Sequence, residues 1–264
     1  MVLLASSSRM VSIYVLLVIL FLVCLLLFSF RGNRVLPLAP KSKVLLVSAH
    51  PDDETMFFSP VLRGLRLGGH RVFVICISTG NFYGLGRVRG GEMFRAVSKL
   101  GLASSDVTIL DYEEFQDGSA WDRHQLAAVL LKHIEVLSVD CVISFDSHGV
   151  SGHNNHISCF EALQDLYTRS LMPKDVQVFV LDSISLARKY IGLFDAPISV
   201  LRSPYRYFAW GRDVAAAWRA MLKHRSQLVW FRFLFMIFSR YIYINTLRRI
   251  APVVRVPRQK SKTS

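Results

Sequence analysis

The chain has 264 residues, of which 52% are apolar and 19% charged, and its formal net charge is +13. This length suits one α/β domain with residues left over for a membrane segment, and it leaves little room for two domains. Its four cysteines form no disulfide framework, which argues against a small disulfide-rich secreted protein.

The N-terminal region contains a candidate membrane span. Residues 11–30 include no charged side chain, and about 20 such apolar residues cross a bilayer as a helix. A cleaved secretory signal is the alternative, but the run exceeds the ~7–15 residues of a signal core. Basic side chains are more frequent after the run than before it, which places the bulk of the chain in the cytosol. We predict a short segment over 1–10, a transmembrane helix over 11–30 and a basic linker over 31–42.

Residues 43–225 alternate between strand-like and helix-like segments and form the predicted main domain. The strand-like segments are continuous β-branched runs, the pattern of parallel strands covered on both faces. We predict strands at 44–48, 72–78, 107–110, 141–145 and 176–181, and helices at 54–67, 91–100, 123–137 and 155–170. The predicted fold class is α/β, a Rossmann-like, mostly parallel sheet with helices on both faces. Sites in such sheets form beyond the carboxyl ends of the strands.

The C-terminal part is aromatic and basic. Residues 226–247 are rich in aromatic side chains but include Arg232 and Arg240, which are costly inside hydrocarbon. We expect an interfacial helix here, and an amphipathic helix packed on the domain is the alternative. A basic tail follows over 248–264. Since residues 201–264 hold 14 basic side chains and one acidic one, we expect an anionic lipid surface as a partner and no nucleic acid.

The first chemical signal follows the first strand as Ala-His-Pro-Asp-Asp-Glu. His50 and Asp53 are three residues apart at a strand-to-helix turn, so both can face one point, and their donor atoms suit zinc or another divalent ion. Asp52 is then free for proton transfer. The alternative is that these acids only favour the start of the following helix, and Glu54 is interpreted in that way.

The second signal follows the fourth strand, where His153 and His156 form a His-x-x-His pair. Such a pair is weak evidence for a metal site by itself, and it becomes strong evidence together with the first loop. Three protein ligands and one open position define a catalytic metal site, and His50, Asp53 and His156 make such a set. The surplus groups, Asp52 and His153, are placed to act as base and acid.

The two loops together resemble the zinc-dependent, LmbE-like N-acetylglucosamine deacetylase superfamily of Rossmann-like hydrolases. The resemblance is closer to its eukaryotic membrane branch, the N-acetylglucosaminylphosphatidylinositol de-N-acetylases, and runs over about residues 43–247. The closer match is carried by Ser78–Asn81, Gly149–His156, Arg188–Ile191, His224–Leu228, Trp230–Phe231 and Phe238–Tyr241.

The resemblance implies zinc at His50, Asp53 and His156, with Asp52 as general base. His153 would stabilise the oxyanion and assist the departing amine. Many bacterial relatives have Pro-Asp between the two histidines where Asn154-Asn155 stands here, so the carboxylate partner of His153 is missing, and Asp146 is a candidate replacement.

The implied activity removes acetate from a glycolipid, N-acetylglucosaminyl-phosphatidylinositol, on the cytosolic face of the endoplasmic reticulum, as the second step of glycosylphosphatidylinositol-anchor synthesis. Deacetylation of another amino-sugar conjugate is an alternative that the site chemistry permits. A non-catalytic Rossmann-like binding protein is disfavoured, because the first turn lacks a Gly-x-Gly-x-x-Gly fingerprint. Neither the metal used in cells nor the oligomeric state follows from the sequence.

Weaker candidates for substrate contacts are Asn81, Arg89 and Asp117, which lie in or near the loops after the second and third strands. For Arg89 the alternative is a helix-surface ion pair with Glu92. The remaining histidines have no motif support and are interpreted as ordinary helix or loop residues; they are His70, His124, His133, His148 and His224.

Overall fold

The described part of the chain comprises residues 12–21, 23 and 35–250 of a computed structural model. Residues 12–21 are helical and exposed, and apart from residue 23 the remainder of the predicted span at 11–30 lies outside the described residues. Within the described ranges, no helix combines the length and apolar character that crossing a bilayer requires. Residues 1–10, 31–34 and 251–264 are likewise outside the described part.

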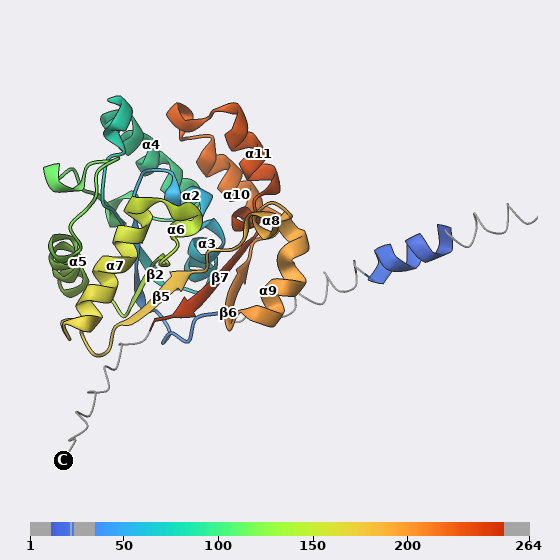
Figure 1. The fold of residues 1–264 in the computed structure, drawn as a ribbon, viewed down its shortest axis with the longest axis horizontal. Helices are drawn as coiled ribbons and strands as arrows, with labels where there is room; N and C mark the ends of the chain where they lie inside the picture. Colours follow the sequence, from blue (N-terminus) through green and yellow to red (C-terminus); the bar gives the residue numbers. More distant parts are fainter. Residues whose placement is uncertain (1–11, 22, 24–34, 251–264) are drawn as a thin grey trace, which may run out of the picture.

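A seven-stranded mixed sheet with the order β3-β2-β1-β4-β5-β7-β6 forms the centre of the fold (Figure 1). All five predicted strands are present and mutually parallel. Two further strands, β6 and β7, add an antiparallel extension that the sequence analysis does not predict. The bounds are β1 Lys43–Ser48, β2 Arg71–Cys76, β3 Val107–Ile109, β4 Cys141–Phe145, β5 Gln177–Leu181, β6 Tyr205–Phe208 and β7 Ile244–Arg249.

The sheet has a topological switch point between β1 and β4. From β1 the chain builds outward through β2 to β3, then returns to place β4 on the other side of β1. The loops after β1 and β4 therefore leave neighbouring strands in opposite directions and leave a crevice between them, which is where ligands bind in open α/β sheets.

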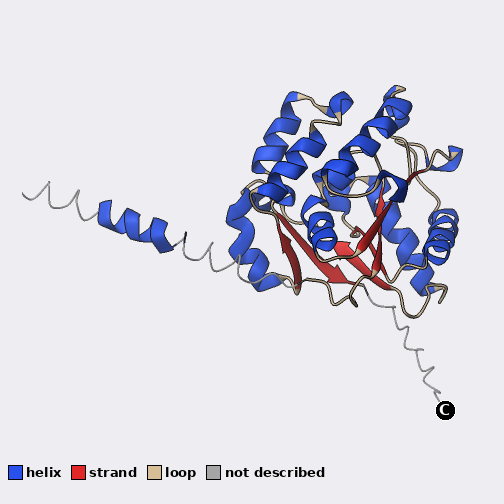
Figure 2. Cartoon of the chain, turned by 180° about the vertical axis from the view of Figure 1, so that it is seen from behind, coloured by secondary structure: helices blue, strands red, loops and turns tan. Residues whose placement is uncertain are grey.

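Helices lie on both sides of the sheet (Figure 2). One side carries α5 and α7, which pack on each other, and the other carries α3, α4 and α10. The bounds are α2 Asp53–Met56, α3 Ser59–Leu67, α4 Gly86–Lys99, α5 Arg123–Leu137, α6 Gly149–Gly152, α7 Asn154–Thr168, α8 Leu186–Lys189, α9 Ala196–Arg202, α10 Arg212–Met221 and α11 Trp230–Phe238. Short 3₁₀ turns include η1 Asn81–Tyr83, η4 Gly192–Asp195, η5 Arg225–Gln227 and η6 Arg240–Ile242.

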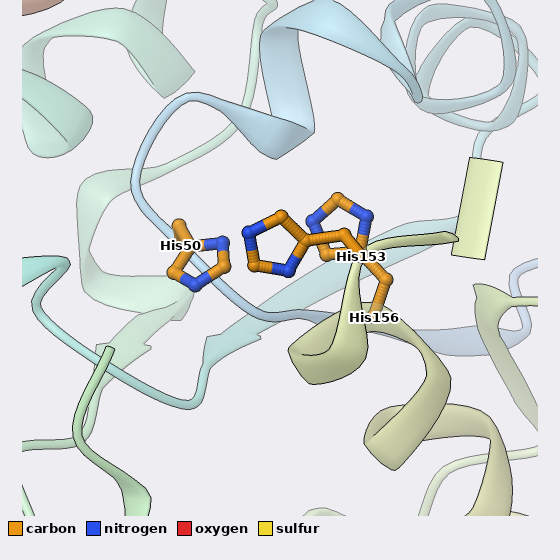
Figure 3. Close-up of side chains that lie close together, drawn as sticks. All are labelled: His50, His153 and His156. Carbon is orange, nitrogen blue, oxygen red and sulfur yellow. The ribbon is translucent and has the colours of Figure 1, made fainter. Parts of the chain in front are cut away.

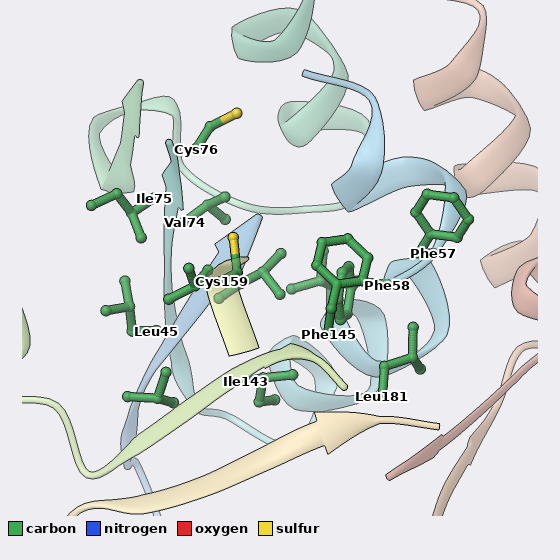
Figure 4. Close-up of a cluster of buried hydrophobic side chains, with 14 of the residues drawn as sticks. Leu45, Phe57, Phe58, Val74, Ile75, Cys76, Ile143, Phe145, Cys159 and Leu181 are labelled. Atoms are coloured by element: carbon green, nitrogen blue, oxygen red, sulfur yellow. The ribbon is translucent and has the colours of Figure 1, made fainter. Parts of the chain in front are cut away.

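The helix predicted over 54–67 is divided into α2 and α3. The break falls at Phe57 and Phe58, and α3 has Pro60 in its first turn. Proline is tolerated in a first turn because the missing N–H has no helical partner there, and it favours a new start over continuation. Phe57 and Phe58 thereby turn into the core and pack edge-to-face on Phe145 (Figure 4).

The segment 226–247 also differs from the single helix expected for it. Its first half contains α11, and its second half forms η6 and most of β7. Because β7 lies between β5 and β6, the sheet of the domain continues to Arg249 rather than ending near residue 225.

A buried ion pair joins η6 to η4. Arg240 and Asp195 are both fully buried, with 2.7 Å between Nε and Oδ2. Arg240 Nη2 donates to the hydroxyls of Ser199 (3.0 Å) and Thr246 (2.8 Å), and Arg188 also bonds to Asp195. Burying a charge is costly unless it is paired, so removal of one partner leaves the other uncompensated.

We expect Arg240→Leu to lower the free energy of unfolding by about 3 kcal/mol, because it leaves part of the charge on Asp195 unpaired in the interior. Arg71→Leu is the matched control, since Arg71 binds Asp106 with a similar geometry but its side chain is 60% exposed. Exposed pairs contribute less than about 1 kcal/mol. Urea unfolding of the detergent-solubilised protein measures the free energy of unfolding of both variants. Equal losses of stability in the two variants would contradict a larger contribution from the buried pair.

Candidate active site

The loop after β1 is shaped by the carboxylate of Asp53. Its Oδ2 accepts the backbone N–H groups of Ala49 (3.0 Å) and His50 (2.8 Å), which folds residues 49–53 into a tight turn. Its other oxygen, Oδ1, lies 3.2 Å from Nε2 of His156, which comes from the loop region after β4. Asp53 therefore connects the two loops of the switch point.

The loop after β4 is held by glycine and by a histidine-to-backbone bond. Gly149 has φ +54°, and a Cβ there would lie 3.0 Å from Cβ of His156, so this close approach requires glycine. His156 Nδ1 lies 3.1 Å from the carbonyl of Gly149 and donates to it, which leaves Nε2 facing the crevice. Metal-binding histidines are commonly oriented by such a bond from the second ring nitrogen.

Three imidazoles converge in the crevice (Figure 3). His50 comes from the loop after β1, and His153 and His156 come from the start of α7. One ring nitrogen of each lies within 4.8 Å of the others. Nε2 of His50 and Nε2 of His156 are buried, and each faces a carboxylate oxygen, at 3.1 Å from Oδ1 of Asp117 and 3.2 Å from Oδ1 of Asp53. Imidazole nitrogens and carboxylate oxygens that face one point are the donors that a divalent ion prefers, so these residues fit such an ion.

The predicted ligands and the predicted acid thus lie together. Asp53 is 3.2 Å from His156 and 3.8 Å from Nδ1 of His50, and the half-exposed ring of His153 stacks on His156 at 4.6 Å between centroids. Burial alone would raise the pKa of Asp53, but the positive charge and hydrogen bond of His156 lower it overall. Burial and the neighbouring His156 and His50 lower the pKa of His153 to about 4. His153 is therefore a neutral imidazole near pH 7.

Asp52 is buried between two arginines. Its Oδ2 lies 3.1 Å from Nη2 of Arg232 and 3.8 Å from Nη2 of Arg89. Burial raises the pKa of Asp52, and the charges of Arg232 and Arg89 oppose that rise. The backbone of Asp52 has φ 126°, in the region that L-residues rarely adopt, so the turn that presents this carboxylate must be held by its surroundings.

Arg89 lines the site and forms no surface ion pair with Glu92. It donates to the carbonyls of Gly80 (2.9 Å) and Pro51 (2.8 Å). Glu92 instead accepts the N–H and hydroxyl of Ser226, at 2.9 and 2.6 Å.

A cavity of about 220 Å³ contains these groups. Besides the three histidines, Asp52 and Asp53, it is lined by Phe57, Arg89, Asp117, Ser151, Gln227 and Arg232. Asp117, which faces Nε2 of His50, is among these lining residues, and its predicted contact with substrate stays a prediction. Asn81 does not line the cavity; it is exposed and its Oδ1 accepts the N–H of Gly86 at 2.8 Å.

Asp146 does not replace the missing partner of His153. Its carboxylate accepts the backbone N–H of His148 (3.0 Å), the N–H and hydroxyl of Ser183 (2.9 and 2.5 Å) and Nη2 of Arg248 (3.2 Å). These bonds hold the loop after β4 against the end of β5.

Glu54 and His224 are site residues that the sequence analysis missed. Both are fully buried, and His224 Nε2 lies 2.7 Å from Oε1 of Glu54. Glu54 Oε2 accepts the backbone N–H of Asp52 at 3.1 Å, so Glu54 holds the strained turn rather than merely starting a helix. Burial would lower the pKa of His224, but the carboxylate of Glu54 raises it overall. The only sequence signal for His224 is its place in the stretch 224–228 of the family resemblance.

The α/β fold of this chain matches the fold of the LmbE-like deacetylases. The N,N'-diacetylchitobiose deacetylase from Pyrococcus horikoshii aligns with a TM-score of 0.56 and 17% identity, covering 80% of this chain and 84% of that chain. At this identity the likeness concerns the fold alone.

Sequence relatives give the family. A model described as "PIG-L: GlcNAc-PI de-N-acetylase" matches residues 45–167. The N-acetylglucosaminyl-phosphatidylinositol de-N-acetylase of Bos taurus is 44% identical over 209 residues, covering 78% of this chain and 83% of that protein. A probable enzyme of the same name from Dictyostelium discoideum is 35% identical over 242 residues, covering 80% of this chain and 94% of that protein. The chain belongs to the N-acetylglucosaminyl-phosphatidylinositol de-N-acetylase family.

We expect Glu54→Gln to lower kcat by about 10- to 100-fold with little change in KM, because a small displacement of a reacting group can cost this much. Release of acetate from the family's substrate measures kcat and KM. Asp165→Asn is the control, since Asp165 also contacts a histidine, His124, at 3.1 Å but lies outside the cavity. A KM effect without loss of kcat would contradict a positioning role.

Proposed function

We propose that the chain hydrolyses the acetamide of N-acetylglucosaminyl-phosphatidylinositol, giving glucosaminyl-phosphatidylinositol and acetate, the second step of glycosylphosphatidylinositol-anchor synthesis. The observation that carries the proposal is the imidazole and carboxylate cluster at the switch point, in which Nε2 of His50 and Nε2 of His156 face the carboxylates of Asp117 and Asp53. Family membership, with 44% identity to the Bos taurus protein, supplies the substrate.

In this proposal His50, Asp53 and His156 hold a divalent ion, and zinc suits two imidazoles and a carboxylate. When bound there, the ion supplies Lewis acidity, which polarises the amide carbonyl and acidifies water. His153 lies beside these groups and points its ring into the same cavity.

Asp52 then acts as the general base. It takes a proton from the water whose oxygen forms a bond to the acetamide carbon. Arg232 and Arg89 favour its ionised form and fix its position, since one guanidinium is 3.1 Å and the other 3.8 Å from Oδ2. His153, neutral and half-buried, donates a hydrogen bond to the carbonyl oxygen as negative charge develops there.

Collapse of the tetrahedral species breaks the C–N bond. The leaving amine needs one proton, and Asp52 carries the proton that it took from water. Return of that proton from Asp52 to the amine balances the reaction and restores the ionised base. The second proton of the water remains on the acid product, which ionises to acetate and gives that proton to the amine or to solvent, and both products leave the cavity.

The proposed location is the endoplasmic reticulum membrane, with the domain in the cytosol. The uncharged residues 11–30 would serve as a single anchor, and the basic residues after them favour this orientation. The partners would be the glycolipid substrate and an anionic lipid surface.

We expect Asp52→Asn to lower kcat by about 100- to 10,000-fold, the usual contribution of a general base. Acetate release from N-acetylglucosaminyl-phosphatidylinositol in detergent micelles measures it. Asp175→Asn, at an exposed position outside the cavity, should retain wild-type activity. Full activity in Asp52→Asn would rule out the proposed base.

We expect His156→Ala and Asp53→Ala to lose bound zinc, with a fall in affinity beyond the ~10- to 100-fold that loss of an outer-shell partner costs. His153→Ala should keep zinc and lose turnover, because His153 is assigned to the oxyanion. His148→Ala, in the same loop with its side chain 77% exposed, is the control. Elemental analysis of the purified variants decides, and zinc loss in His153→Ala with retention in Asp53→Ala would reverse the two assignments.

A further inference from the structure

Helix α11 has one buried side and one strongly apolar exposed side. Phe235 and Met236 pack into the core, and Phe235 meets Phe57 edge-to-face at 5.7 Å. The outer side carries Trp230, Phe231, Leu234, Ile237 and Phe238, with Trp230 74% exposed and Phe238 50% exposed. Contiguous exposed apolar surface of this kind marks an interaction site.

The apolar surface continues from α11 onto residues 190–194. Phe194 is 71% exposed, and Tyr190 and Ile191 are also exposed. Between this segment and the end of α11 lies a groove of about 470 Å³. Its lining is Tyr190, Ile191, Gly192, Leu193, Phe194, Ile237, Phe238 and Tyr243, which includes no charged residue. The buried Arg240–Asp195 pair joins η6 to η4 and so fixes the two walls relative to each other.

Two exposed arginines lie near this surface in the sequence. Arg225 lies in η5 just before α11, and Arg202 ends α9 beside Leu201, which is 86% exposed. Neither arginine forms an ion pair with any acid in residues 35–250. Asp213 is the single acidic residue of 201–264, and its Oδ1 forms an ion pair with Nη2 of Arg63 at 2.7 Å. Exposed positive charge in the segments next to an aromatic face complements anionic lipid head groups above an apolar layer.

The inner side of the same helix reaches the active site. Arg232 lies on the same side of α11 as Phe235 and Met236, which are three and four residues further along. Its Nη2 is 3.1 Å from Oδ2 of Asp52. The helix that presents the apolar surface outward therefore also positions the carboxylate assigned to proton transfer.

We propose that the outer side of α11 and residues 190–194, together the docking face, bind an anionic phospholipid bilayer, and that this docking holds Arg232 against Asp52 so that lipid contact increases turnover. The second part rests on the proposed function, and the first part does not. Arg232 is a positioning residue in this scheme, since it acts through Asp52.

The first experiment tests docking alone. The full chain is reconstituted in vesicles of phosphatidylcholine with phosphatidylserine, with or without brominated acyl chains, and tryptophan fluorescence is recorded. We expect bromolipid to quench the wild type more than Trp230→Phe, because Trp230 would lie among the acyl chains. Equal quenching of the two proteins would overturn lipid docking and favour a protein partner for this face.

The second experiment tests the link to catalysis. Phe231→Ser/Phe238→Ser removes apolar contacts at exposed positions, where folding is little affected. We expect kcat in anionic vesicles to fall by about ten-fold in this variant, and detergent micelles to reduce the difference. Val136→Ser, 74% exposed on α5 at the far side of the domain from α11 (Figure 1), should behave as wild type.

The outcomes of the two experiments are separable. Unchanged kcat in the double variant, with quenching of Trp230 intact in the wild type, would overturn the link through Arg232 but not docking. Arg232→Gln should lower kcat in vesicles and micelles alike, and Arg232→Lys should recover part of it. Absence of deacetylation in wild type, with Trp230 quenched, would overturn the proposed function and leave docking standing.

Discussion

The contact between Asp53 and His156 is the constraint on which the site depends. It joins the loop after β1 to the helix after β4, across the point where the sheet changes its direction of growth. One carboxylate oxygen organises the backbone of its own loop, and the other faces the imidazole. Without this contact, the two loops would be separate polar turns at neighbouring strand ends, and His50 and His156 would have no common point to face.

Around this contact the protein buries several charged groups, which lie in pairs. Asp52 is balanced by Arg89 and Arg232, and Glu54 by His224. Buried ion pairs add little net stability compared with apolar packing, so their presence suggests a requirement other than stability. Here they hold the strained turn at Asp52 and keep a carboxylate available inside a small cavity.

The parallel part of the fold follows from local patterns. Four of the five predicted strands are mostly buried apolar runs, and β3 is a three-residue strand in which Thr108 is exposed. The loops that follow the first and the fourth strand contain most of the site. The sequence does not reveal β6 and β7 in the same way, because Tyr205–Phe208 is a short strand with an arginine inside it and β7 follows an aromatic run with helical character. Their pairing depends on contacts between segments about 40 residues apart, which a local pattern does not report.

The same limit applies to the site. His50, Asp53 and His156 could be predicted because each stands in a short motif at a strand end. Glu54 and His224 could not, since their roles arise from a contact between positions 170 residues apart. The sequence analysis interpreted Arg232 from its aromatic neighbours, most of which lie on the outer side of α11. Its contact with Asp52 is made on the inner side of the helix.

The segment from His224 to Arg249 explains why the chain needs more than the five parallel strands. It closes the cavity with Gln227 and Arg232, buries His224 behind Asp52, and then returns into the sheet as β7. This segment is held at one end by the His224–Glu54 contact and at the other end by the pairing of β7 in the sheet. Helix α11 lies between these two fixed points. In the proposed docking, a displacement of α11 would therefore also displace Arg232 relative to Asp52.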